Sequence, residues 1–159
     1  MPIRFPAVIP TDTIYGLVGR ALNRREVAAV YRLKKRPARK PSIVLISRLD
    51  DLRLFGVKLN PKRKVVLKRL WPGRVSIIID GQAFRLPAKK TLLKLLKQTG
   101  PLVAPSANPA AEPPAQTITK AKKYFGNAVA TYVNGGRLRG KPSKLIKLNR
   151  RGQITVLRP

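Results

Sequence analysis

The chain has 159 residues, and its 35 Lys and Arg against 6 Asp and Glu give a formal net charge of +29. The hydrophobic fraction of 43% is that of a folded protein rather than a disordered one. With no His and no Cys, Ser-His-Asp and Cys-His catalytic sites, ordinary zinc sites and disulfides are excluded, and the few scattered acids disfavour a two-metal centre.

The N-terminal segment predicts a strand, a polar turn and a helix. Residues 3–9 are mostly apolar and run into the polar stretch 10–13, Pro-Thr-Asp-Thr, as a strand runs into a turn. Asn23, followed three residues later by Glu26, is typical of a capping box at a helix N-terminus. Pro37 disfavours helical geometry in the residue before it, so the helix is expected to end near Lys35.

The central segment continues this alternation. Residues 43–47 form a short apolar run, which predicts a buried strand, and a short helix is expected from a cap at Asp50. Pro61 suits the first turn of a helix that ends at Trp71. Asp80-Gly81 lies between two apolar runs and predicts a tight hairpin.

The C-terminal part is richer in strands. A helix with four leucines is expected to end at Gly100. The elements predicted after it are a strand at 102–105, a helix at 117–125, and strands at 128–133, 144–148 and 153–158. Alternating elements followed by strands favour an α/β fold, a single domain over residues 1–159 with a twisted mixed sheet flanked by helices.

Polar clusters stand where predicted elements end. They are Thr11 to Thr13, Lys34 to Arg36, Ser106 to Asn108, and Ser143. Taken singly, each cluster is more often a cap, a turn or a surface charge pair than part of a functional site. Ligands in open α/β sheets nevertheless bind at strand ends, so the four clusters together are a candidate site.

In their order along the chain, these clusters and their flanks resemble the YrdC-like family of threonylcarbamoyl-AMP synthases. The segments that carry the resemblance are PTDTIYGL, LKKRPARKPSIVLIS, LWPGRVSIII, FRLP, GPLVAPSANPAAEPP, and GKPSKLI followed by VLRP, which together span nearly the whole chain. The resemblance implies a YrdC-like fold with a basic concave cavity. It also implies a nucleotidyltransferase that joins L-threonine, bicarbonate and ATP into threonylcarbamoyl-AMP, releases pyrophosphate, and serves the t6A modification at tRNA position 37.

The resemblance also assigns roles to residues of this chain. The implied catalytic residues are Lys34, Arg36, Ser106 and Asn108. Those on the ATP side are Arg36, Lys40, Ser106 and Arg158. Those expected at L-threonine are Thr13, Ser143 and Arg85, the last binding its carboxylate. Mg²⁺ is expected to arrive with ATP, held through phosphate oxygens and water, with no metal site built from protein side chains.

Elementary chemistry agrees with the role implied for Arg85. The planar guanidinium of Arg85 matches a carboxylate in a bidentate way, and an inward-facing Arg without a partner would be costly. Asp12 is expected to be a structural group that bonds its own backbone in the turn, because a turn Asp commonly does so, rather than a catalytic base.

Departures from the family pattern leave alternatives open. No helix precedes the first predicted strand, the hairpin at 80–81 is short, and Lys144, Arg74 and Leu45 replace residues usual in the family. The net charge predicts binding of double-stranded RNA or tRNA whatever the fold. The alternatives to an enzyme are a non-catalytic protein that acts through this binding, and an engineered, minimised scaffold on the same fold. Since no signal peptide or membrane span is apparent and the charge opposes self-association, we expect a cytoplasmic monomer.

Overall fold

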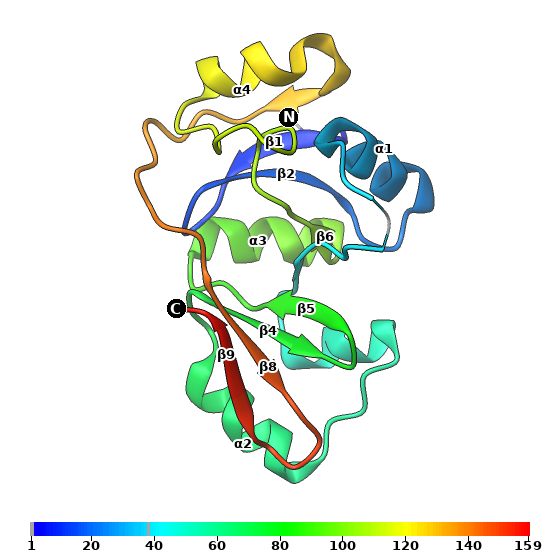
Figure 1. Ribbon diagram of the computed structural model, residues 1–159. Helices are drawn as coiled ribbons and strands as arrows, with labels where there is room; N and C mark the ends of the chain where they lie inside the picture. Colours follow the sequence, from blue (N-terminus) through cyan, green and yellow to red (C-terminus); the bar gives the residue numbers. More distant parts are fainter. Residues whose placement is uncertain (1, 38) are drawn as a thin grey trace.

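The fold is a mixed β-sheet flanked by helices, as the sequence predicts. The computed structural model describes residues 2–37 and 39–159, and in this part of the chain the strands form one sheet in the order β7-β1-β2-β6-β3-β5-β4-β8-β9 (Figure 1). The strands are β1 (Ala7–Pro10), β2 (Tyr15–Arg20), β3 (Val44–Leu45), β4 (Val75–Ile79), β5 (Gln82–Arg85), β6 (Leu102–Val103), β7 (Thr131–Tyr132), β8 (Lys144–Leu148) and β9 (Ile154–Arg158).

Helices cover both faces of this sheet. The α-helices are α1 (Arg24–Lys34), α2 (Pro61–Leu70), α3 (Lys90–Thr99) and α4 (Ile118–Phe125), and the 3-10 helices are η1 (Leu49–Phe55) and η2 (Gly126–Ala128). In the described part of the chain, no helix has the length and apolar character needed to cross a membrane.

The antiparallel pair β1–β2 shows how the core forms on two sides. Val8 lies opposite Leu17, and both belong to the larger apolar cluster, which also contains side chains of α1 and α4. Ala7 lies opposite Val18, and both belong to a second cluster with Leu96 of α3. Because successive side chains of a strand point to opposite faces, this pair is buried between helices on either side (Figure 1).

Several predicted strands are shorter than expected. The expected strand at 3–9 becomes β1 at Ala7–Pro10, since Pro6 has no N–H to donate to a ladder. The run at 43–47 contributes the two-residue β3, and Ile43 and Ile46 each add one backbone hydrogen bond to a neighbouring segment. The run ends at Ser47, which donates its backbone N–H to Asp51 instead. The expected strands at 102–105 and 128–133 each contribute two residues to the sheet. The strands at 144–148 and 153–158 are confirmed within one residue.

The helix ends follow the predicted caps, with two corrections. Asn23 accepts hydrogen bonds from the backbone N–H groups of Arg25 and Glu26, as expected of an N-cap. The Glu26 carboxylate does not close a capping box; it accepts from the backbone and guanidinium of Arg20. At η1 the capping acid is Asp51 rather than the expected Asp50, because its Oδ2 atom accepts from two N–H groups before the helix.

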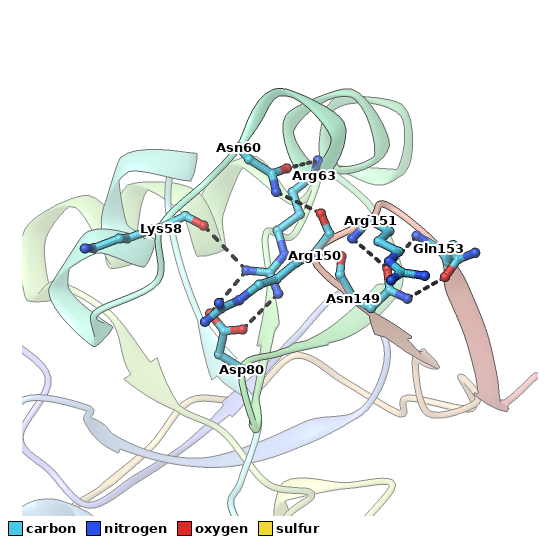
Figure 2. Close-up of polar contacts among 8 residues, drawn as sticks. All are labelled: Lys58, Asn60, Arg63, Asp80, Asn149, Arg150, Arg151 and Gln153. Carbon is cyan, nitrogen blue, oxygen red and sulfur yellow. Dashed lines mark hydrogen bonds and ion pairs between the residues drawn. The ribbon is translucent and has the colours of Figure 1, made fainter.

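A buried arginine ties α2 to the hairpin of β4 and β5. Arg63 is 3% exposed, and its guanidinium contacts both carboxylate oxygens of Asp80 at 3.1 and 2.8 Å (Figure 2). Asp80 and Gly81 both have positive φ, 49° and 88°, which is the conformation of a tight hairpin turn with Asp-Gly. The expected hairpin is thus confirmed, and its turn is fixed by a bidentate ion pair.

Candidate functional site

The polar clusters of the sequence converge on one cavity of about 440 Å³. Its walls come from the β1–β2 turn, the segment after α1, the hairpin of β4 and β5, the segment after β6, and the ends of β8 and β9. Of the predicted site residues, those that line it are Thr13, Arg36, Lys40, Arg85, Ser106, Ser143 and Arg158. Lys34 and Asn108 are not among its lining residues and lie behind Ser106.

The turn between β1 and β2 is held by the hydroxyl of Thr11. Its Oγ1 atom donates to the carbonyl of Ile14 at 2.6 Å and accepts from the backbone N–H of Thr13 at 3.1 Å. The Thr13 hydroxyl lies 3.1 Å from this oxygen, and since the Thr11 proton is already given to Ile14, Thr13 donates to Thr11. The Thr13 oxygen therefore presents acceptor capacity, not a proton, to its other neighbours.

One of those neighbours is Arg85, which is paired with a buried acid. Arg85 Nη1 donates to Thr13 Oγ1 at 3.2 Å, and Arg85 Nη2 lies 3.0 Å from Asp12 Oδ1. The two side chains are only 5% and 8% exposed. The contact is an ion pair without good hydrogen-bond geometry: both Asp12 oxygens and Arg85 Nε lack a hydrogen-bond partner among the described residues.

Most of the surroundings of Arg85 disfavour its positive charge. Burial lowers the pKa of Arg85, while the negative charge of Asp12 opposes that shift. The positive charges of Arg158 and Arg74 lower the pKa further. Asp12 thus keeps a buried guanidinium charged next to other cations. The structural role expected for Asp12 is therefore to compensate the charge of Arg85. The expected hydrogen bonding of Asp12 to its own backbone is wrong, since neither carboxylate oxygen has a partner among the described residues.

Lys34 organises the loop after β6. Its Nζ atom donates to the carbonyl and the hydroxyl of Ser106, both at 2.9 Å, and to Asn108 Oδ1 at 2.8 Å. All three ammonium donors are used, so Lys34 fixes Ser106 from behind. Burial, and secondarily the charge of Arg36, lower the pKa of Lys34 to about 8. Because Ser106 Oγ accepts from Lys34, its own proton is free to be donated toward the cavity.

Two more arginines of the cavity, Arg36 and Arg158, are held by backbone carbonyls. Arg36 donates to the carbonyls of Lys40 and Pro41 at 2.7 and 3.0 Å, which closes the loop after α1. Arg158, near the end of β9, donates to the Ser143 carbonyl through Nε and Nη2 at 3.1 and 2.8 Å. Both guanidinium groups line the cavity and keep N–H groups available for an anion.

Three participants were missed from the sequence as site residues. Arg39 lines the cavity and could have been suspected from its place between Arg36 and Lys40. Ser76 lies 2.7 Å from Ser143, oxygen to oxygen, and both are buried. Asp12 belongs to the polar turn at 10–13, but no signal in the sequence indicates that its partner is Arg85, far along the chain.

The sequence comparisons agree with one another. The Sua5/YciO/YrdC family model, described as "Telomere recombination", matches residues 6–159. The chain is 29% identical over 166 residues to the threonylcarbamoyl-AMP synthase of Pyrococcus abyssi, a match that covers 94% of this chain and 48% of that protein. It is 30% identical over 143 residues to the threonylcarbamoyl-AMP synthase of Bacillus subtilis, covering 80% and 41%. The chain thus spans less than half the length of these two curated relatives.

The fold is also found in solved structures. The crystal structure of P. abyssi Sua5 complexed with L-threonine matches with a TM-score of 0.84 at 29% identity, over 96% of this chain and 49% of that one. The Escherichia coli YciO structure matches with a TM-score of 0.82 at 21% identity, which supports the fold alone.

Proposed function

The chain belongs to the Sua5/YciO/YrdC family, and on this premise we propose that it forms threonylcarbamoyl-AMP and pyrophosphate from L-threonine, bicarbonate and ATP. The observation that carries the proposal is the convergence of Thr13, Arg85 and Ser143 with the cations Arg36 and Arg158 around one cavity. Its relatives in P. abyssi and B. subtilis bear the name of this enzyme, and P. abyssi Sua5 has been crystallised with L-threonine.

The hydrogen-bond directions at the cavity suit an amino acid. Arg85 uses one contact on Thr13 and one on Asp12, which leaves N–H groups for a substrate carboxylate. The Thr13 oxygen has only acceptor capacity left, so it suits a donor such as the amine or hydroxyl of L-threonine. We assign the L-threonine subsite to this side of the cavity, with Ser143 as the third contact.

The opposite wall suits a nucleotide. Arg36, Lys40 and Arg158 supply positive charge for a triphosphate and a departing pyrophosphate, and Ser106 offers its hydroxyl proton to a phosphate oxygen. Lys34 and Asn108 act here by holding Ser106 in place. Among the residues that the structure describes, no carboxylate lines the cavity, and we propose that Mg²⁺ is carried by the phosphate oxygens of ATP and by water.

The reaction that these groups can support has two steps. The amine of L-threonine takes up the carbon of bicarbonate as a carbamate, and one water is released. A carbamate oxygen then attacks the α-phosphorus of ATP; the new P–O bond replaces the bond to the β-phosphate, and pyrophosphate leaves. The protein contributes positioning and neutralisation of the charge on the departing oxygens, which is the main catalytic work in phosphoryl chemistry. We propose that the product serves tRNA modification.

The test is pyrophosphate release from ATP and Mg²⁺, with and without L-threonine and with and without bicarbonate. We expect release only with both co-substrates, because the attacking carbamate forms from L-threonine and bicarbonate together. Such a result would be diagnostic, since nonspecific ATP binding by a +29 chain cannot create a threonine requirement. Arg85→Lys should raise the KM for L-threonine about tenfold or more, since it keeps the charge but loses the bidentate geometry. The matched control is Arg53→Lys, on an arginine that is 79% exposed. Release without a threonine requirement, from folded protein, would refute the proposal.

Binding of double-stranded RNA or tRNA stays a prediction that rests on the net charge of +29. It is compatible with either an active or an inactive cavity. The threonine requirement therefore separates an enzyme from a non-catalytic RNA-binding protein or scaffold, whereas RNA binding alone does not.

A further inference from the structure

β9 lies at one edge of the described sheet. β9 pairs with β8 in antiparallel register, and in the described part of the chain the sheet order ends with β9 (Figure 1). All five residues of β9 are exposed. Its outer side therefore presents unpaired backbone N–H and C=O groups, which can template the addition of another strand.

Three of the five side chains of β9 are apolar. Ile154, Val156 and Leu157 are 38%, 52% and 52% exposed. Edge strands of monomeric proteins are usually protected by a charge, a proline, a β-bulge or a covering segment. The pairing of β9 with β8 shifts register only near its C-terminal end, at Leu157, and is regular over Ile154–Val156. Here the one cation of β9, Arg158, turns its guanidinium onto the Ser143 carbonyl in the cavity wall and does not cover the apolar residues.

The edge is held in place by its turn. Asn149 Oδ1 accepts from the backbone N–H groups of Arg151 and Gln153, both at 2.9 Å (Figure 2). Asn60, the N-cap of α2, donates to the Arg150 carbonyl at 2.8 Å and thereby fastens the turn to the helix. A partner strand would therefore meet a preorganised edge, and little ordering entropy would be lost on this side.

The charge around the edge selects the chemistry of a partner. Residues 113–159 contain no acid, and exposed cations rim the β8–β9 hairpin: Lys144, Lys147, Arg150 and Arg151. A second copy of the chain would bring another +29 charge to the same place, which opposes self-pairing. RNA would satisfy the cations, but no aromatic residue follows Tyr132 for base stacking, and a phosphate backbone cannot extend a β-ladder.

We propose that the outer edge of β9 is a docking site for an extended acidic polypeptide segment, which adds to the sheet as a further strand. The partner backbone would pair with β9, its apolar side chains would cover Val156 and its neighbours, and its carboxylates would face the basic rim. This mode of recognition draws affinity from main-chain hydrogen bonds and specificity from alternate side chains. It is independent of the proposed enzyme activity, since the edge lies outside the cavity except at Arg158.

The experiment is a titration of the ¹⁵N-labelled protein with a blocked peptide of about seven residues that alternates Glu and Val. We expect the amide signals of β9 to shift first, together with that of Ser143, which Arg158 links to the strand. The reference peptide has the same sequence with N-methyl groups on alternate amides, which keeps the charge and removes half the backbone donors. It should bind at least about tenfold more weakly, since main-chain bonds supply the affinity.

A matched pair of variants places the site. Val156→Lys puts a charge on the edge and should weaken binding by about tenfold or more. Val65→Lys makes the same change on α2, at a valine that is 68% exposed, and should leave binding unchanged within about twofold. Both positions are more than half exposed, so both variants should fold.

Three results would overturn the proposal. Equal binding of both peptides, or equal loss in both variants, would mean attraction by charge alone. Self-association of the wild type that Val156→Lys abolishes would make a second copy the occupant. Duplex RNA that shifts the same β9 amides and displaces the peptide would make nucleic acid the occupant.

Discussion

Removing Asp12 should show how strongly the cavity depends on one buried acid. The substitution Asp12→Asn keeps the shape of the side chain and removes its charge from beside Arg85. Because Arg85 is 5% exposed, water in the cavity replaces the lost negative charge only in part. The variant therefore leaves a cation buried among other cations, and we expect it to lower the free energy of unfolding.

The magnitude follows from the geometry. At 3.0 Å and an effective dielectric constant of about 20, the attraction between the two charges is about 5.5 kcal/mol. Desolvation of both groups offsets part of this, so the loss on breaking the pair should be about 3–5 kcal/mol. Arg85→Met breaks the same pair from the other side. Combining the two substitutions removes both charges and should cost much less than the sum of the single losses.

The assay is a double-mutant cycle followed by urea unfolding at neutral pH. We expect a coupling free energy on the order of 2–3 kcal/mol between Asp12 and Arg85. The control cycle uses Asp50→Asn and Arg53→Met, an exposed pair 3.9 Å apart, where the coupling should be about 0–1 kcal/mol. If the coupling at the buried pair is no larger than at the exposed pair, the argument that Asp12 sustains the charge of Arg85 is wrong.

Two further predictions concern the loops around the cavity. Lys34 should titrate with a pKa near 8 in ¹³C NMR of its ε-carbon, and Arg36→Gln should raise this value in part, because burial is the larger cause of the shift. Since the folded pKa lies below the ordinary value of about 10.5, the unfolded chain binds more protons between pH 8 and 10.5, and the contribution of Lys34 to stability should rise with pH over that window. Gly140→Ala should destabilise the fold by about 1–3 kcal/mol, measured by thermal unfolding, because the added Cβ would collide with the backbone carbonyl of Thr13.

Elements with a local cause could be predicted from the sequence. The helix beginning at Pro61 and the hairpin at Asp80-Gly81 each depend on a few adjacent residues, and both are confirmed. The lengths of the strands at 3–9 and 43–47 could not be predicted, because a strand lasts only as long as its neighbours pair with it. Which acid would cap η1 was likewise decided by tertiary packing, since Asp50 and Asp51 are equivalent in sequence.

The sequence predicted which residues lie at the cavity better than it predicted how they contact one another. The resemblance pointed to Thr13, Arg85 and Ser106 as site residues, and in the fold all three line the same cavity. It could not show that Lys34 stands behind Ser106, because that depends on how the end of α1 meets the loop after β6. Nor could it show the partner of Asp12, since an ion pair across the sheet leaves no periodic signal in the chain.

The large net charge and the chemistry of the cavity are physically separable. Charges on the surface are screened by salt beyond about 8 Å at physiological ionic strength, whereas the buried guanidinium of Arg85 is governed by fixed neighbours, above all Asp12. Lys34 is likewise set by its burial and by three protein acceptors. A surface on which cations replace acids can therefore change what the molecule attracts without changing how the cavity holds a substrate. For this reason the +29 charge affects which partners the protein attracts, whereas the proposed enzyme activity is tested by substitutions at Arg85.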